Sequence, residues 1–215
     1  MNRSTVHTFE DQSVKEEIAN SVTHGIGALC AIAATAVLIV VAAMDHTAIR
    51  VVGVSVFGAA LVLLYTASSL YHGIQTPRIK HVLHILDHSA IFLLIAGTYT
   101  PITLCALQGG WGWSIFGVTW GLAVLGIVTT AVYFERARYL SLALYIAMGW
   151  LIVITGPRLF SAMNWQALMW LFIGGVLYTA GVIFYRMKRL RFHHMVWHLF
   201  VLAGSVCHVF MMMQI

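Results

Sequence analysis

The stretch from His88 to Phe134, HSAIFLLIAGTYTPITLCALQGGWGWSIFGVTWGLAVLGIVTTAVYF, runs for 47 residues without a single Asp, Glu, Lys or Arg. A helix needs about 20 apolar residues to cross the hydrocarbon core of a bilayer, so this stretch has room for two crossings. Near its middle, Gln108, Gly109 and Gly110 supply a break. The stretch therefore predicts two membrane-spanning helices joined by a tight turn.

The remainder of the chain repeats this pattern of apolar segments bounded by charges. The charge-free segments are 18–44, 51–77, 139–157, 159–185 and 192–215, and each has room for one helix. Backbone polar groups in lipid must be satisfied internally, and these segments lack the alternation of barrel strands, so only helices fit. We expect an all-α membrane protein, a seven-transmembrane helix bundle with helices near 22–43, 51–73, 86–107, 111–133, 139–155, 165–185 and 193–214.

The composition excludes a soluble protein. Of 215 residues, 60% are hydrophobic and 9% are charged, whereas a soluble surface carries roughly 25–35% charged residues. We expect a short cytoplasmic tail at 1–16 and a single seven-helix domain at 17–215. Because the start of the chain is polar and acidic, no cleavable signal peptide is expected.

The basic residues predict the orientation. Arg50 and Arg158 are the two that fall on one side of the predicted membrane. The other side has the remaining ten: Arg3, Lys15, Arg78, Lys80, Arg136, Arg138, Arg186, Lys188, Arg189 and Arg191. Under the positive-inside rule the N-terminus is cytoplasmic and the C-terminus extracytoplasmic, in a multi-pass protein of the inner (plasma) membrane. The net charge of +5 reflects this topology and attraction to lipid head groups, not a nucleic-acid partner.

Histidines are concentrated at the predicted cytoplasmic level. Ionisable groups inside a membrane are costly and are usually functional. Nine of the 11 fall in this tail, these loops or these helix ends: His7, His24, His72, His81, His84, His88, His193, His194 and His198. His194 and His198 are spaced i, i+4, which puts both imidazoles on one helix face, where they can bind one metal ion. Two histidines hydrogen-bonded at a membrane interface would show the same spacing, so this pair alone does not distinguish a metal site from a structural role.

Two other predicted helices place Ser68, His72 and Asp87 at the same cytoplasmic level. Ser68 and His72 end the helix predicted at 51–73, and Asp87 opens the next one. Three imidazoles and a carboxylate suit Zn²⁺, as four direct ligands or as three ligands plus a water that the carboxylate holds. His84 and His88 bracket Asp87 and form a second pair at the same spacing, and periodicity does not choose between the two sets.

The first helix contributes Glu17, Asn20 and His24, which share one face at i, i+3 and i+7. Glu17 near a helix start also suits the macrodipole, and that role alone would explain its presence. His24 lies a turn inside the apolar segment, where a hydrogen bond to a group around the metal site would satisfy it. These three residues are candidates for the layer that surrounds the ligands.

Five segments together resemble the hemolysin III family, the bacterial branch of the progestin and adiponectin receptor superfamily. They are Glu17-Ile-Ala-Asn20-Ser-Val-Thr23-His24, Ser68-Ser-Leu-Tyr-His72, Leu86-Asp87-His88-Ser89, Ala96-Gly97-Thr98-Tyr99-Thr100-Pro101 and His194-Met-Val-Trp-His198. The resemblance implies seven helices, a cytoplasmic N-terminus and a zinc held by His72, His194 and His198. It also implies that Asp87 holds the zinc-bound water and that Ser68 lies beside the site, which favours this set over His84 and His88.

Two functions are compatible with such a site. One is a zinc-dependent, ceramidase-like hydrolase of a membrane lipid amide or ester, in which Asp87 orients the water or acts as general base and Ser68 stabilises the oxyanion. The other is a sensor or receptor-like regulator in which a structural zinc staples helices together. The family resemblance implies a role in membrane lipid homeostasis, with membrane lipids as partners. A pore or cytolytic activity is not expected, because the sequence has no internal inverted repeat and no amphipathic lytic segment.

Overall fold

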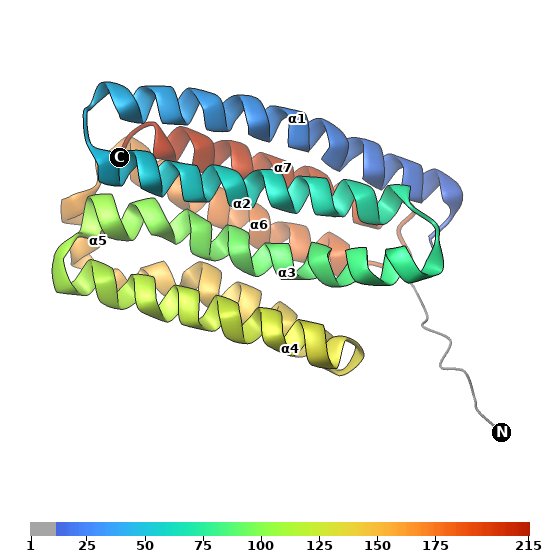
Figure 1. The fold of residues 1–215 in the computed structure, drawn as a ribbon. Helices are drawn as coiled ribbons and strands as arrows, with labels where there is room; N and C mark the ends of the chain where they lie inside the picture. The colour runs from blue at the N-terminus through green and yellow to red at the C-terminus, as the bar shows by residue number, and fades with distance from the viewer. Residues whose placement is uncertain (1–11) are drawn as a thin grey trace.

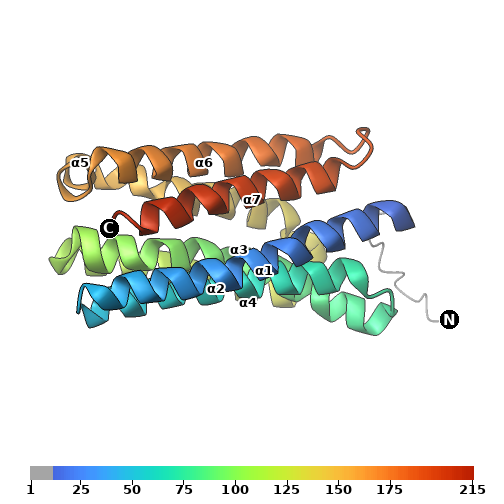
Figure 2. The same cartoon turned by 90° about the horizontal axis from the view of Figure 1, so that it is seen from above.

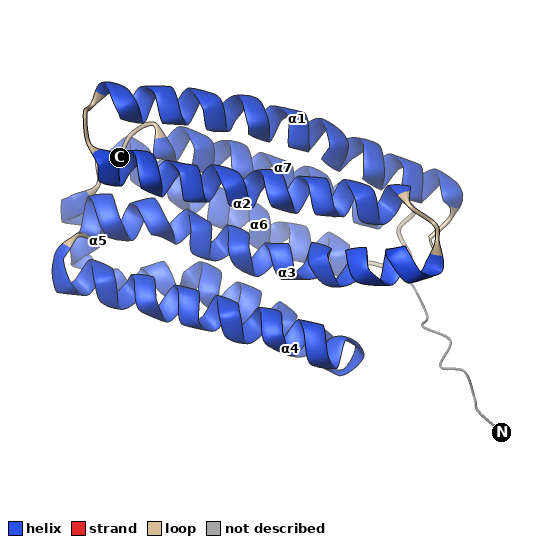
Figure 3. Ribbon diagram, viewed as in Figure 1, coloured by secondary structure: helices blue, strands red, loops and turns tan. Residues whose placement is uncertain are grey.

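The protein is all-α, as predicted. A computed structural model describes residues 12–215, without the side chains of residues 135–138, and contains no strand in that part of the chain. Arg3, His7 and the side chains of Arg136 and Arg138 lie outside the described residues. The elements are α1 (Val14–Met44), α2 (Ala48–Gly73), α3 (Pro77–Pro101), a π-helical turn (Ile102–Leu107), α4 (Gly109–Trp150), a 3₁₀ turn (Leu151–Thr155), α5 (Pro157–Ala162), α6 (Trp165–Arg186) and α7 (His193–Met212) (Figures 1 and 3).

Six helices within the described residues are long and apolar enough to cross a membrane. They are Val14–Met44, Ala48–Gly73, Pro77–Leu107, Gly109–Phe134, Trp165–Arg186 and His193–Met212. A further apolar helix, Tyr139–Thr155, is shorter than these. The protein is therefore a multi-pass membrane protein, while the seventh crossing remains a prediction.

α4 contains the helix predicted at 111–133 and most of the helix predicted at 139–155, whose last residues form the 3₁₀ turn. They are joined at Tyr133, whose backbone is not helical (φ −125°, ψ 34°), and the chain turns back there (Figure 1). The predicted break before α4 is also present, since Gln108 and Gly109 both have positive φ. Pro101 ends α3, and the distorted turn that follows accommodates its missing N–H.

Two helices begin eight or nine residues earlier than predicted, because the ends of the charge-free segments mark the hydrocarbon boundary and not the helix termini. α1 begins at Val14, inside the expected tail, where Ser13 and Glu16 form a capping box. α3 begins with Pro77, which suits a first turn because no N–H is needed there. Asp87 consequently lies well inside α3 and not at its start.

The helices form two groups that enclose the interior. Figure 2 shows α6 and α7 on one side and α1, α2, α3 and α4 on the other, and α1 packs against both α2 and α7. The helices approach closely at small residues: a Cβ on Gly58 would lie 2.3 Å from Thr35, and one on Gly126 would lie 2.3 Å from Phe92. Gly117 and Gly121, which form a GxxxG pattern, have no such neighbour within 4 Å among the described residues.

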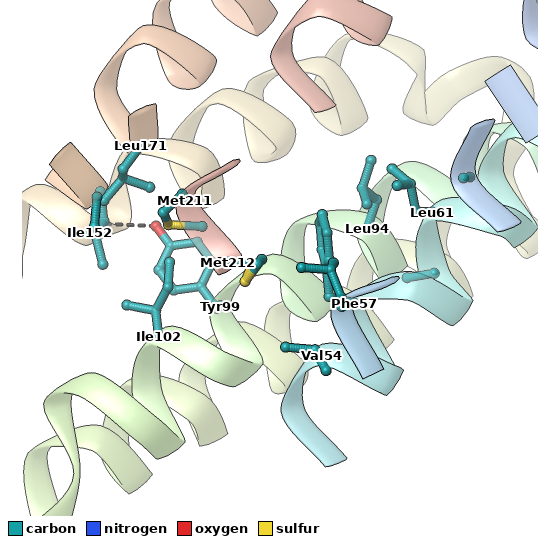
Figure 4. Packing of buried hydrophobic residues seen from close by; sticks show 14 of the residues in the cluster. Val54, Phe57, Leu61, Leu94, Tyr99, Ile102, Ile152, Leu171, Met211 and Met212 are labelled. Atoms are coloured by element: carbon teal, nitrogen blue, oxygen red, sulfur yellow. Dashed lines mark hydrogen bonds between the residues drawn. The ribbon is translucent and has the colours of Figure 1, made fainter. Parts of the chain in front are cut away.

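Tyr99 attaches the short helix Tyr139–Thr155 to α3. Its hydroxyl donates to the carbonyl of Met148 at 2.8 Å and accepts from the backbone N–H of Ile152 at 2.7 Å. Figure 4 shows the hydrogen bond between Tyr99 and Ile152 beside Ile102, Leu171, Met211 and Met212 in the buried apolar cluster. Tyr99 thus supplies a hydrogen-bond partner to the Met148 carbonyl and the Ile152 N–H, where α4 changes to a 3₁₀ turn.

The starts of α1, α3 and α7 and the end of α2 meet at one end of the bundle, on the right in Figure 1. This end contains His72, His194 and His198, and α7 finishes at the opposite end (Figures 1 and 2). The first residue of α1 and the last residue of α7 therefore lie at opposite ends of the bundle.

Candidate metal centre

Three histidines converge at this end of the bundle. His72 is the penultimate residue of α2, and His194 and His198 lie one turn apart on α7. One ligand atom from each lies within 4.8 Å of the others, and the three side chains are buried, with 0–6% exposure. Nitrogens bound to one zinc ion lie about 2.0–2.1 Å from it, so this separation is close to the spacing that one ion requires.

The hydrogen bonding of His72 fits a metal ligand. Its Nδ1 lies 2.6 Å from Oε2 of Glu17, to which it can donate a proton. Its Nε2 is buried and has no hydrogen-bond partner among the described residues. Leaving such groups without a partner is unfavourable, and a metal ion bound at Nε2 removes that cost while Nδ1 keeps its proton.

Asp87 and Ser68 reach the same region from α3 and α2. Both are buried, with 6% and 1% exposure, and the Asp87 carboxyl interacts electrostatically with His88 and His72. Asp87 is not among the residues whose ligand atoms lie within 4.8 Å of one another. Of the three histidines, His72 thus interacts with the carboxylate, which lies outside the closely spaced group.

The predicted surrounding residues on α1 differ in how they contact the histidines. Glu17 bonds His72 directly, and the ring of His24 stacks on that of His198 with a centroid distance of 3.5 Å and an interplanar angle of 12°. Asn20 is fully buried, and its amide nitrogen donates to Gln12 at 2.5 Å. The first turns of α1 therefore form one wall of the site.

The competing pair on α3, His84 and His88, makes other contacts, although Nδ1 of His88 lies 3.8 Å from Oδ2 of Asp87. The ring of His84 stacks on Tyr71 with a centroid distance of 4.6 Å and also contacts Phe134. Nδ1 of His88 lies 3.1 Å from the carbonyl of His84, within its own helix. In the part of the chain that the structure describes, neither residue belongs to the closely spaced histidine group.

Lys80 is a residue of the site that the sequence interpretation missed. It is buried, with 4% exposure, and its Nζ donates to Oε1 of Glu17 at 2.7 Å and to the carbonyl of Tyr71 at 3.3 Å. In the sequence it is one of the ten basic residues on the predicted cytoplasmic side. Its position seven residues before Asp87, on the same face of α3, is a signal that could have indicated an inward orientation.

A cavity of about 500 Å³ adjoins the histidines. It lies between α3, the second half of α4, α6 and α7, and apolar side chains dominate its lining. Asp87 and His194 line it at the metal end, and Tyr99 and His208 line it deeper in the bundle. An elongated apolar molecule with a polar group near Asp87 would fit this arrangement.

Comparison with known proteins identifies the family. Residues 12–209, which include every candidate site residue, match the family described as Haemolysin-III related. The chain is 44% identical over 198 residues to Hemolysin-3 homolog of Bacillus subtilis (strain 168), covering 92% of this chain and 93% of that protein. It is 45% identical over 199 residues to Hemolysin-3 of Bacillus cereus, covering 93% and 91%.

A more distant relative comes from animals. Monocyte to macrophage differentiation factor of Homo sapiens is 26% identical over 163 residues, covering 72% of this chain and 66% of that protein. No solved structure gives a significant match. The helical membrane fold, the buried histidine group and these matches agree, and the chain belongs to the Haemolysin-III related family.

Proposed function

We propose that this protein is a zinc-dependent hydrolase that cleaves an amide or ester bond of a membrane lipid and acts in membrane lipid homeostasis. The observation that carries the proposal is the convergence of His72, His194 and His198 with the buried Asp87 carboxyl beside an apolar cavity. When bound, zinc would lower the pKa of a coordinated water to about 7 and polarise a carbonyl group.

The residues of the chain take distinct roles in this proposal. His72, His194 and His198 hold the metal through ring nitrogens, and Glu17 keeps the proton of His72 on Nδ1. Asp87 orients the attacking water and accepts its proton as general base. Ser68, buried one turn before His72, donates a hydrogen bond to the carbonyl oxygen as negative charge develops on it.

The cavity supports a lipid as the substrate class. Its wall includes Ile91, Leu94 and Ile95 of α3, Phe172 of α6 and Val201 of α7. An acyl chain packed against these side chains would keep water away from the scissile bond, with the bond itself next to Asp87. Membrane lipids are thus the proposed partners.

We propose seven crossings, with Tyr139–Thr155 as the fifth, and a cytoplasmic N-terminus in the inner (plasma) membrane. The helix ends near the metal site carry Lys15, Arg78, Lys188 and Arg191. At the opposite end of the bundle, Arg50 lies in the first turn of α2 and Arg158 lies in α5. This distribution supports a metal centre on the cytoplasmic side.

The second candidate function is a non-enzymatic sensor or receptor-like regulator with a structural zinc. One observation favours it. The candidate ligands come from α2, α3 and α7, so a bound metal ion would hold these three helices together. In this case Asp87 is a fourth ligand, and no position is left for water.

The substitution Asp87→Asn distinguishes the two candidates. For a hydrolase, the purified variant keeps about one zinc per chain, because three imidazoles still bind it, whereas lipid turnover is lost because an amide cannot act as the base. Metal analysis and lipid analysis of the host membrane provide the measurements. For a regulator, zinc content and thermal stability fall together.

The control for this experiment is Asp45→Asn, at the other end of α1. It should leave zinc content and membrane lipids at their parental values. If Asp87→Asn keeps its zinc, its stability and the parental lipid composition, the hydrolase proposal is wrong.

A further inference from the structure

Two adjacent carboxylates in the first turn of α1 contact the two helices that supply the metal-binding histidines. Glu17 Oε2 lies 2.6 Å from Nδ1 of His72, near the end of α2. Glu16 Oε1 accepts a hydrogen bond of 3.0 Å from the backbone N–H of Phe192, which immediately precedes α7. One turn of α1 therefore reaches both parts of the site.

Glu17 is held by a second partner that determines which of its oxygens faces His72. Oε1 accepts from Lys80 Nζ at 2.7 Å, so Oε2 remains for the histidine. Lys80 also donates to the carbonyl of Tyr71 and to Gln75, at 3.3 and 3.2 Å. Since a lysine ammonium can only donate hydrogen bonds, the atom of residue 17 that faces it must be an acceptor.

Glu16 has a comparable position at the start of α7. Its Oε2 accepts from the backbone N–H and the hydroxyl of Ser13, at 2.9 and 2.6 Å, which fixes the side chain. Phe192 has a left-handed backbone (φ 59°) and provides no side-chain cap for α7. The Glu16 carboxylate instead accepts from the N–H of Phe192 itself, and its charge suits the positive end of the helix dipole.

We propose that Glu16 and Glu17 are positioning residues for the metal centre, with Lys80 as the buried partner that orients Glu17. Glu17 sets the tautomer of His72, so that Nε2 is free for the metal, and Glu16 holds the start of α7, which supplies His194 and His198. The inference rests on the proposed metal site. It assigns a role in metal affinity, exerted through His72, to the ion pair between Glu17 and Lys80.

The decisive test compares two neutral replacements of the ion pair. In Glu17→Gln/Lys80→Met the amide oxygen can face His72 and accept from Nδ1–H. In Glu17→Met/Lys80→Met the side chain has a similar length and no such acceptor. Both variants lack an unpaired buried charge, so both should remain folded.

The probe is zinc alone, added to the metal-free full-length protein in detergent, with affinity measured by competition against a chelator. Loss of the acceptor should weaken zinc binding in Glu17→Met/Lys80→Met by about 10–100-fold, whereas Glu17→Gln/Lys80→Met should bind more tightly than that variant. The absorption spectrum of bound Co²⁺ gives an independent readout and should differ from the parent mainly in the variant without an acceptor. Equal zinc affinities and equal spectra for the two variants would overturn the role of Glu17.

Single substitutions complete the experiment. In Glu17→Gln with Lys80 retained, the amide oxygen is drawn to Lys80 and the NH₂ group faces His72, so zinc binding should be weaker than in Glu17→Gln/Lys80→Met. Glu16→Met should weaken binding, whereas Asp45→Asn, which removes an ion pair with Arg50 at the far end of α1, should not. Parental affinity in Glu16→Met would overturn the role of Glu16. A parent protein that binds no zinc would instead disprove the proposed metal site.

Discussion

His72 shows how one side chain can satisfy two different requirements in a membrane interior. Its Nδ1 lies 2.6 Å from Glu17, and its Nε2 has no hydrogen-bond partner among the described residues. His84 is also a histidine and lies in the neighbouring helix, yet its ring stacks on that of Tyr71 and makes a tilted contact with Phe134. The chemical roles of the two histidines follow from these contacts and not from residue type.

This difference predicts the metal content of two single variants. His72→Ala should lose most of the zinc from the purified protein, because one of three ligands is removed. His84→Ala removes a ring of the same size outside the group and should keep about one zinc per chain. Metal analysis of both proteins is the measurement. Full zinc retention in a protein with both His194→Ala and His198→Ala would contradict the assignment.

At the level of the elements, glycines determine how closely helices approach. A Cβ on Gly174 of α6 would lie 2.5 Å from the ring of His208 on α7, and one on Gly204 would lie 3.0 Å from Tyr178. On α4, in contrast, Gly117 has no such neighbour within 4 Å among the described residues. The GxxxG pattern of α4 therefore does not mark a close contact within this chain, whereas single glycines of α6 and α7 do.

Gly174→Ala should accordingly destabilise the protein, by about 1–3 kcal/mol, because the added methyl group forces His208 to move. Gly117→Ala should leave stability unchanged or raise it by about 0.5–1 kcal/mol through the lower flexibility of alanine. Thermal unfolding of the two variants in the same detergent measures the contrast. Equal melting temperatures would show that the α6–α7 contact is not as close as described.

For the whole molecule, the short helix Tyr139–Thr155 decides the topology. The chain turns back near Tyr133, and α1 begins and α7 finishes at opposite ends of the bundle (Figures 1 and 2). Tyr99 of α3 holds the end of this helix through Met148 and Ile152. A helix fixed in this way can traverse the bundle although it is shorter than its neighbours.

A reporter fused after Ile215 should therefore be extracytoplasmic, whereas one inserted after Lys188, between α6 and α7, should be cytoplasmic. The reason is the ten-to-two distribution of basic residues together with the seven crossings that we propose. Activity of the two fusions in intact cells is the measurement. A cytoplasmic signal from both positions would mean that Tyr139–Thr155 does not cross.

The sequence by itself determined the membrane class, the helical fold, the turn at Gln108–Gly110 and the pairing of His194 with His198. These features depend on hydropathy and spacing within one contiguous segment, and such local properties are readable without a structure. Only the tertiary structure decided that His72 joins the α7 pair while His84 and His88 do not, that Lys80 is buried against Glu17, and that Asp87 adjoins a cavity. Each of these depends on which side chains of distant segments meet when helices pack, and neither hydropathy nor periodicity specifies those neighbours.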